Sequence, residues 1–176
     1  VNARIYVNNA LPYNITNVGP QINSEWPDYG PSVNRDETVM VFTTRRQQGN
    51  TNADVFEDNF PYEEIFIAYK QEDGEWGAAQ NISSAINTPY FDSNLAISDD
   101  GRELYLYRDD NNGDVYISRL QNDGNWSFPE PLEGEINSSF KETSISVSSS
   151  GDLIFFASDR PGGQGGLDIY YSTRDR

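Results

Sequence analysis

The chain has 176 residues, enough for one domain with a sizeable core, and its formal net charge at pH 7 is −16. That charge would repel phosphate backbones and anionic lipid, so nucleic acid is not an expected partner. The sequence has no cysteine and no histidine, which excludes disulfides and removes the commonest metal ligand and general base. No apolar run approaches the roughly 18 residues that a membrane-spanning helix needs, so no transmembrane segment is predicted.

The first complete repeat unit is predicted over residues 21–84. It opens at Ile22-Asn23, and strands are predicted at 38–44 and 64–68 because both runs are rich in β-branched and aromatic residues. A turn at Asp73-Gly74 then leads to Trp76, where a fourth strand would begin. Residues 1–20 resemble the second half of such a unit, and we assign them to the outer strands of a preceding one.

A long insert, residues 45–63, separates the second and third strands of this unit. A loop of this length inside a compact repeat is usually functional or disordered. One interpretation is a mobile loop whose aromatic side chains fold back on the strands. The other is a partner-binding protrusion with aromatic anchors and cations beside them. The candidate partner-binding residues are Arg45, Arg46, Phe56, Phe60 and Tyr62.

The second unit, residues 85–135, repeats the same order. Ile86-Asn87 precedes an alternating stretch at 95–98, and a turn at Gly101 leads to apolar strands at 103–107 and 114–118. Asp-Gly-Asn-Trp at 123–126 lies fifty positions after Asp-Gly-Glu-Trp at 73–76.

The loop at 109–114, DDNNGD, collects carboxylate and amide oxygens of the kind that bind calcium. Its spacing does not fit an EF-hand, because the twelfth position would be Arg119 and no glutamate stands there. The simpler interpretation is a hairpin loop in which Asn and Gly adopt left-handed conformations. We therefore predict no cofactor and no metal site, and calcium is left open without a motif to support it.

The third unit, residues 136–176, contains three predicted strands. Ile145 and Val147 alternate with serines, residues 153–157 form an apolar run, and 168–171 are aromatic and β-branched. The glycine-rich loop at 159–166 between the last two cannot hold regular structure.

Four short strands per unit and a period near fifty residues are typical of β-propeller blades. We predict an all-β fold of four-stranded antiparallel blades, about three blades' worth. Because propellers close with about four to eight blades, we expect these blades to be part of a larger propeller.

The order of these motifs resembles the TolB-like β-propeller repeat, a WD-type repeat of bacterial envelope proteins. Residues 156–172, FASDRPGGQGGLDIYYS, are similar to copies found in OmpA-family outer-membrane lipoproteins. The resemblance implies a periplasmic, outer-membrane-associated protein. The partners it implies are envelope proteins, including a peptidoglycan-associated complex and secretion or gliding machinery.

Two sets of residues recur at fixed positions in the units. Glu64, Asp114 and Asp168 each open a third strand, and a catalytic pair would not need to recur in every unit. We interpret them as structural acceptors of backbone or hydroxyl hydrogen bonds. Trp76 and Trp126 also recur, which favours packing between blades over stacking on a sugar.

Without histidine or cysteine the usual nucleophilic triads cannot be assembled from this chain. Our leading hypothesis is a non-catalytic propeller scaffold that mediates protein–protein interaction in a Gram-negative envelope assembly, and not an enzyme. The alternative is a carbohydrate-binding or carboxylate-dependent glycoside-active propeller, because that chemistry needs only Asp or Glu. The sequence gives no means of choosing a carboxylate pair.

Overall fold

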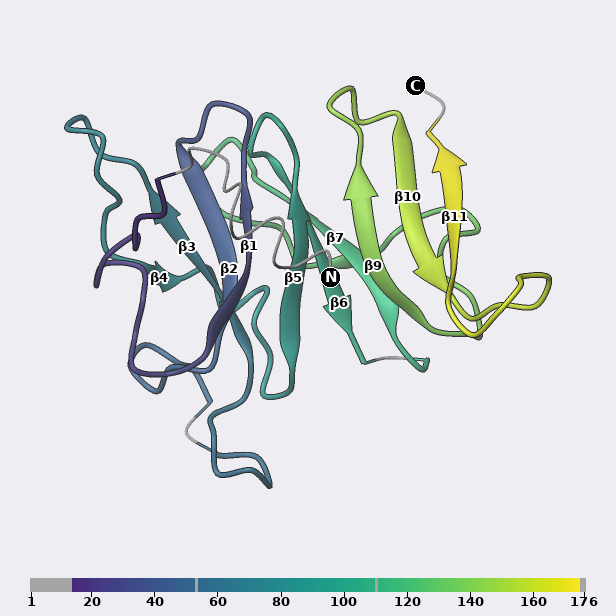
Figure 1. Cartoon of the computed structure of the whole chain (residues 1–176), viewed down its shortest axis with the longest axis horizontal. Helices are drawn as coiled ribbons and strands as arrows, with labels where there is room; N and C mark the ends of the chain where they lie inside the picture. The colour runs from purple at the N-terminus through teal and green to yellow at the C-terminus, as the bar shows by residue number, and fades with distance from the viewer. Residues whose placement is uncertain (1–13, 53, 110, 175–176) are drawn as a thin grey trace, which may run out of the picture.

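The computed structural model describes residues 14–52, 54–109 and 111–174, and the regular elements in these ranges are β-strands. The strands form three antiparallel sheets that stand side by side (Figure 1). Within the described residues there is no helix long and apolar enough to cross a membrane.

Each sheet is a meander in which consecutive strands pair. The first blade consists of β1 (Asp28–Val33), β2 (Val39–Thr44), β3 (Glu64–Tyr69) and β4 (Gln80–Asn81). The second consists of β5 (Asp92–Ile97), β6 (Glu103–Arg108), β7 (Asp114–Arg119) and β8 (Glu130–Pro131). The third contains β9 (Glu142–Val147), β10 (Leu153–Ser158) and β11 (Asp168–Thr173). The predicted all-β class with antiparallel blades is confirmed.

The fourth strands are shorter than the sequence suggests. Trp76 and Trp126 each make only an isolated bridge, and regular pairing is confined to the two residues of β4 and of β8. In the second blade Pro129 and Pro131 lack an N–H to donate to a ladder. In the first blade Gly77, Ala78 and Ala79 have low strand propensity.

The predicted outer strands at residues 1–20 fall mostly outside the described part of the chain, which begins at residue 14. Residues 14–20 contain no strand.

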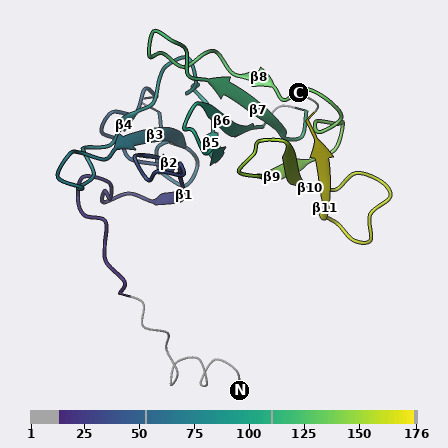
Figure 2. The ribbon, with the colours of Figure 1, turned by 90° about the horizontal axis from the view of Figure 1, so that it is seen from above.

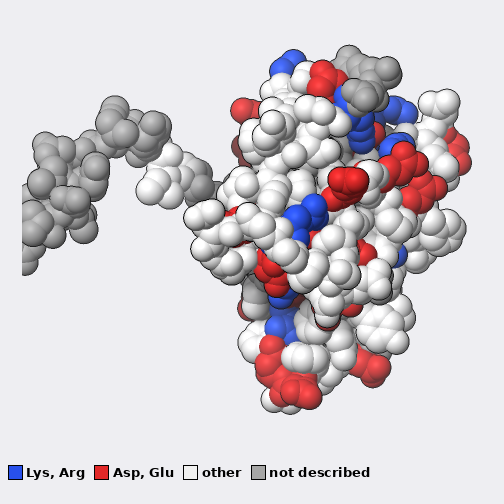
Figure 3. All heavy atoms as spheres, turned by 90° about the vertical axis from the view of Figure 1, so that its right-hand side faces the viewer, with Lys and Arg blue, Asp and Glu red and all other residues white. Residues whose placement is uncertain are grey.

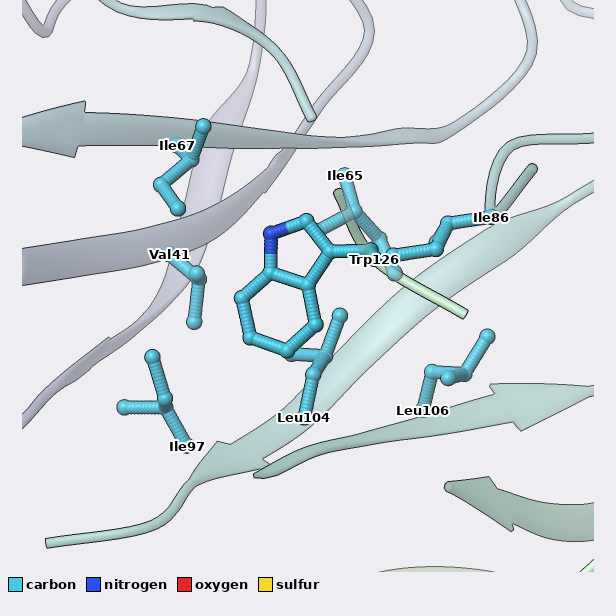
Figure 4. Close-up of a cluster of buried hydrophobic side chains, with 8 residues drawn as sticks. All are labelled: Val41, Ile65, Ile67, Ile86, Ile97, Leu104, Leu106 and Trp126. Atoms are coloured by element: carbon cyan, nitrogen blue, oxygen red, sulfur yellow. The ribbon is translucent and has the colours of Figure 1, made fainter. Parts of the chain in front are cut away.

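Apolar clusters between adjacent blades form most of the core. Between the first and second blades the buried residues are Val41, Ile65, Ile67, Ile86, Ile97, Leu104, Leu106 and Trp126 (Figure 4). Between the second and third they are Tyr105, Val115, Ile117, Leu132, Ile136, Ile145, Ile154 and Phe156. The blades are therefore held together mainly by burial of apolar side chains from both partners.

The first strands of the blades lie on the inner side of the assembly. β1 and β2 contact β5, and β5 and β7 contact β9. Seen from above, β1, β5 and β9 lie toward a common centre and β4, β8 and β11 toward the outside (Figure 2). This radial arrangement is that of propeller blades.

An asparagine side chain bridges each pair of adjacent blades. Asn87 accepts a hydrogen bond from the Ile65 N–H (2.9 Å) and donates one to the Ile65 carbonyl (3.0 Å). Asn137 makes the same pair of bonds with Val115, both at 2.8 Å. The Ile-Asn motif therefore ties the segment that leads into one blade to the third strand of the blade before it.

The far face of the third blade lies open among the described residues. Phe155, Ile169 and Tyr171 are 43%, 74% and 69% exposed. The view onto the side of β10 and β11 has mostly uncharged atoms, with charged groups scattered between them (Figure 3).

Candidate functional site

The insert between β2 and β3 forms a short hairpin of its own. Val55 and Pro61 make an isolated antiparallel bridge, and the Phe56 N–H donates to the Phe60 carbonyl at 2.8 Å. Asn59 closes the turn with φ 63°, a conformation that asparagine tolerates better than most residues. Residues 55–61 of the insert therefore fold back on themselves locally.

Hydrogen bonds fasten the base of the insert to the blades, and one between Asn50 and Tyr62 closes the insert on itself. The Thr51 N–H donates to Glu64 Oε1 at 2.9 Å, and Asn50 Nδ2 donates to the Tyr62 carbonyl at 3.1 Å. Asn52 Nδ2 donates to the carbonyl of Pro89, in the segment that leads into β5, at 2.6 Å. The insert is thus hydrogen-bonded to two blades.

An aromatic cluster packs the insert against the second blade. The rings of Phe56, Tyr62 and Phe91 lie with centroids 4.9–5.7 Å apart in edge or tilted contacts. Such pairs add about 0.5–1.5 kcal/mol beyond the burial of their area. Phe56 is still 38% exposed, so the cluster packs on the blades and also presents an edge to solvent.

Arg45 ties the tip of the insert to its base. Its guanidinium donates to both carboxylate oxygens of Asp58, at 2.5 and 2.9 Å, and its Nε donates to the Pro61 carbonyl at 2.7 Å. This hydrogen bonding holds the pKa of the Asp58 carboxyl below its usual value. The same guanidinium lies over the rings of Phe60 and Phe91, 5.3 and 5.8 Å from their centroids.

Arg46 points elsewhere. It is only 9% exposed, and its Nη2 donates to Asp28 Oδ1 at 2.7 Å and to the Ile22 carbonyl at 2.6 Å. Its guanidinium also lies 4.9 Å from the centroid of Phe66. The expectation that Arg46 stands beside the insert aromatics is therefore corrected, because this side chain stabilises the interior of the first blade.

The pair that Arg46 makes with Asp28 recurs in the other blades. Arg108 lies 3.4 Å from Asp92, and Arg160 lies 3.0 Å from Glu142. In each blade the acid opens the first strand and the arginine stands at or just beyond the end of the second. The hydroxyls four residues before each acid also donate to it, at 2.7–2.9 Å: Ser24, Thr88 and Ser138.

Sequence reasoning missed these pairs, although the chain carries their signal. Each acid follows the Ile-Asn dipeptide at the same distance, and each arginine follows its acid by 16 or 18 positions.

The pKa values of two of these acids are shifted in opposite directions. Burial raises the pKa of the Asp92 carboxyl. At Asp28 burial acts in the same direction, but hydrogen bonds from Thr44, Arg46 and Ser24 outweigh it and the pKa is lowered.

The three repeated third-strand acids each accept hydrogen bonds at the start of their strand. Glu64 is fully buried and accepts from Thr51 and from Asn81 Nδ2 (2.5 Å), and its burial raises the pKa of the carboxyl. Asp114 accepts from Asn111 Nδ2 at 3.0 Å, and Asp168 from the Gln164 and Gly165 N–H groups at 2.9 and 3.1 Å. Their structural role stays our interpretation.

The two repeated tryptophans occupy different surroundings. Trp126 is 7% exposed and lies among side chains of the first and second blades (Figure 4). Trp76 is half-buried on the outer face of the first blade, against the cluster of Met40, Phe42 and Phe66. Only Trp126 lies between two blades of the described structure.

A hollow of about 450 Å³ lies beside the aromatic cluster, between the insert and the second blade. Its lining residues are Phe56, Tyr62, Thr88, Tyr90, Phe91, Arg108 and Asp109. Tyr90 is 73% exposed at its edge. Among the described residues no group of three or more Asp, Glu, His or Cys side chains is arranged to hold a metal ion.

The structure brings together four of the five candidate partner-binding residues. Arg45, Phe56, Phe60 and Tyr62 lie in one surface, and Phe91 and Tyr90 of the second blade join them. Sequence reasoning missed these last two because they lie some thirty positions downstream of the insert. Whether this surface binds a partner stays a prediction.

The chain matches no protein-family model and no curated protein sequence. Among solved structures, the crystal structure of TolB from Acinetobacter baumannii superposes with a TM-score of 0.52 at 15% identity, covering 81% of this chain and 29% of TolB. A putative TolB from Agrobacterium tumefaciens superposes with a TM-score of 0.41 at 15% identity, covering 85% of this chain and 59% of that protein. The periplasmic gluconolactonase PpgL of Pseudomonas aeruginosa superposes with a TM-score of 0.41 at 13% identity, covering 73% of this chain and 35% of that protein.

This chain therefore spans less than two thirds of the length of each of these proteins. The likeness to TolB concerns the fold: the chain is built of TolB-like β-propeller blades.

Proposed function

We propose that this chain is a non-catalytic propeller module that binds other proteins in the envelope of a Gram-negative bacterium. The observation that carries the proposal is the surface formed by the insert: Phe56 and Phe60 are each 38% exposed, yet the insert that holds them is hydrogen-bonded to two blades. Aromatic anchors that are held rigid before binding lose little conformational entropy on association.

The envelope location is part of the same proposal. Its support is the resemblance of the repeats to those of bacterial envelope proteins, together with the TolB-like fold. We place the protein in the periplasm, associated with the outer membrane in the manner of OmpA-family lipoproteins. Envelope proteins would then be its partners, including components of peptidoglycan-associated or secretion complexes.

The absence of catalysis is also proposed. The chain lacks the histidine and cysteine on which most general-base and nucleophilic catalysis depends. The repeated carboxylates are engaged in hydrogen bonds at equivalent places in each blade. A module of rigid blades with a variable insert is suited to presenting a binding surface.

Site-specific photo-crosslinking in the native envelope tests the proposal. A photo-reactive residue at position 60 should give discrete protein adducts, and Phe56→Ala combined with Tyr62→Ala should abolish them. The matched control is the same residue at Phe128, which is 76% exposed outside the insert. Equal labelling from both positions, or none from position 60, would count against a protein-binding role for the insert.

The second candidate is a carbohydrate-active propeller. Tyr90, exposed beside the polar side chains of Asp109 and Arg108, is the observation that favours it, because exposed rings with polar neighbours also suit sugars. Binding on a glycan array that is lost in Tyr90→Ala, or hydrolysis of aryl glycosides, would favour this candidate over the first.

A further inference from the structure

The hollow beside the insert is walled mainly by aromatic rings. Phe56 and Tyr62 come from the insert, and Tyr90 and Phe91 come from the segment that leads into β5. Its volume of about 450 Å³ is within the usual range of about 300–1,000 Å³ for small-ligand sites, so it has room for a guanidinium group. Two segments of sequence that are far apart thus form one aromatic wall.

The uncompensated charge at this hollow is negative. Arg108 is a cation in its lining, but its Nε faces Asp92, which is fully buried, at 3.4 Å, and its Nη2 donates to the Ile86 carbonyl at 2.9 Å. Asp109 is exposed, and it accepts a long hydrogen bond of 3.4 Å from the Tyr107 hydroxyl. Arg108 and Asp92 therefore offset each other, and the carboxylate of Asp109 remains.

The rings of this cluster already hold one guanidinium. Arg45 lies 5.8 Å from the centroid of Phe91, within the distance at which a cation is attracted to the face of an aromatic ring. The same contact recurs in the blades, where Arg108 lies over Tyr116 and Arg160 over Phe156. Arginine over an aromatic ring is therefore a contact that this fold makes repeatedly.

We propose that the hollow receives the side chain of an arginine from a partner protein. The aromatic wall would stack on the guanidinium, and Asp109 would accept its hydrogen bonds from the rim. The net charge of −16 would attract a basic partner segment over a longer range and raise its association rate. This inference rests on the proposed protein-binding function and names the chemistry that the partner presents there.

A peptide titration tests the inference directly. The probes are Gly-Gly-Arg-Gly-Gly and the same peptide with citrulline, which keeps the shape of arginine and lacks its charge. Binding is measured from the NMR amide signals of Tyr90 and Phe91. The arginine peptide should shift these signals and bind about 3- to 10-fold more tightly than the citrulline peptide. Added salt should weaken binding of the arginine peptide more than binding of the citrulline peptide.

Two variants and their controls locate the binding. Tyr90→Ala and Asp109→Asn should each weaken binding of the arginine peptide about 3-fold or more. Both replace exposed side chains, so the blades should fold as in the unchanged protein. Phe128→Ala removes an equally exposed ring, and Glu72→Gln removes a charge in the hairpin at the other end of β3 from the insert. Both controls should bind as the unchanged protein does.

The outcomes separate this inference from the proposed function. Equal binding of arginine and citrulline peptides, or shifts of the Tyr90 signal by saccharides alone, would overturn the cation site. If crosslinking from position 60 persists in that case, the protein-binding function stands without it. Peptide binding as expected with no crosslinked partner would support the site and count against the wider function.

Discussion

The third strands of the second and third blades follow the same residue pattern, DVYISR in β7 and DIYYST in β11, and have very different surroundings. In β7, Val115 and Ile117 are 0% and 2% exposed, whereas Ile169 and Tyr171 at the matching positions of β11 are 74% and 69% exposed. Both strands open with aspartate and pair with their second strands in the same register. The difference comes from the neighbour: β9 packs beside β7, and no described strand covers the outer face of β11.

The repeat therefore specifies a strand and its apolar side, but not whether that side is buried. A blade carries an apolar surface on each face, and each surface contributes to stability only where another blade removes it from water. The energetic unit of this structure is the interface between blades. Substitutions at matched positions test this statement.

The largest difference is expected between the two repeated tryptophans. Trp126→Ala should lower the free energy of unfolding by about 3–5 kcal/mol, because it empties a site buried between two blades. Trp76→Ala should cost clearly less, because Trp76 is only half-buried on the outer face of the first blade. Urea unfolding of both variants measures the difference, and equal losses would mean that the interface does not set the cost.

A similar contrast is expected within the strands compared above. Ile117→Ala should cost about 2–5 kcal/mol, whereas Ile169→Ala should stay within about 0.5 kcal/mol of the unchanged protein. Thermal or urea unfolding again provides the measurement. A large loss at Ile169 would show that this face is covered in solution.

The asparagine bridges should contribute less, and unequally. Asn87→Ala should cost about 1–3 kcal/mol, because it leaves the buried N–H of Ile65 without its partner, whereas the Ile65 carbonyl keeps the hydrogen bond from the Ile82 N–H at 3.2 Å. Among the described residues, the side chain of Asn23, in the same motif, donates to Asn17 Oδ1 on the surface. Asn23→Ala should therefore change stability by about 0.5 kcal/mol or less, and a similar loss in both variants would contradict the bridging role.

The smallest expected effect is an opposite pH dependence in two blades. The pKa of Asp28 is lowered from 3.8 in the folded chain, so its contribution to stability is complete above 3.8 and is lost as the pH falls through the lower folded value. The pKa of Asp92 is raised from 3.8, so its contribution is greatest below 3.8 and declines as the pH rises through the higher folded value.

Unfolding of Asp28→Asn and Asp92→Asn from about pH 6 down to about pH 3 measures both signs. On acidification the free energy of unfolding of the unchanged protein should fall relative to that of Asp28→Asn. It should rise relative to that of Asp92→Asn. Asp92→Asn also leaves Arg108 without its counter-charge, which should add an offset that does not vary with pH in this range. If the difference in stability from the unchanged protein varied with pH in the same direction for both variants, the opposite pKa shifts of Asp28 and Asp92 would be contradicted.

Most of the fold could be predicted from the sequence, and about half of the site. The strands and turns are local, since alternating apolar residues and a glycine with positive φ such as Gly101 or Gly151 indicate them directly. The insert and its aromatic residues also stand out because of their length and composition. The prediction for Arg46 was wrong about its surroundings, since adjacent arginines in the sequence gave no sign that one is buried.

The sequence by itself determined that this protein is a run of β-propeller blades, because the period of two and the period near fifty are properties of the chain alone. Only the tertiary structure decided which apolar faces are buried, and that Phe91 and Tyr90 join the insert in one surface. It also paired each arginine with its acid across 16 to 18 positions. The physical reason is that such contacts depend on how strands and blades are placed relative to one another. The fixed spacing of the acids and arginines marks positions that repeat, but it does not show which side chains touch.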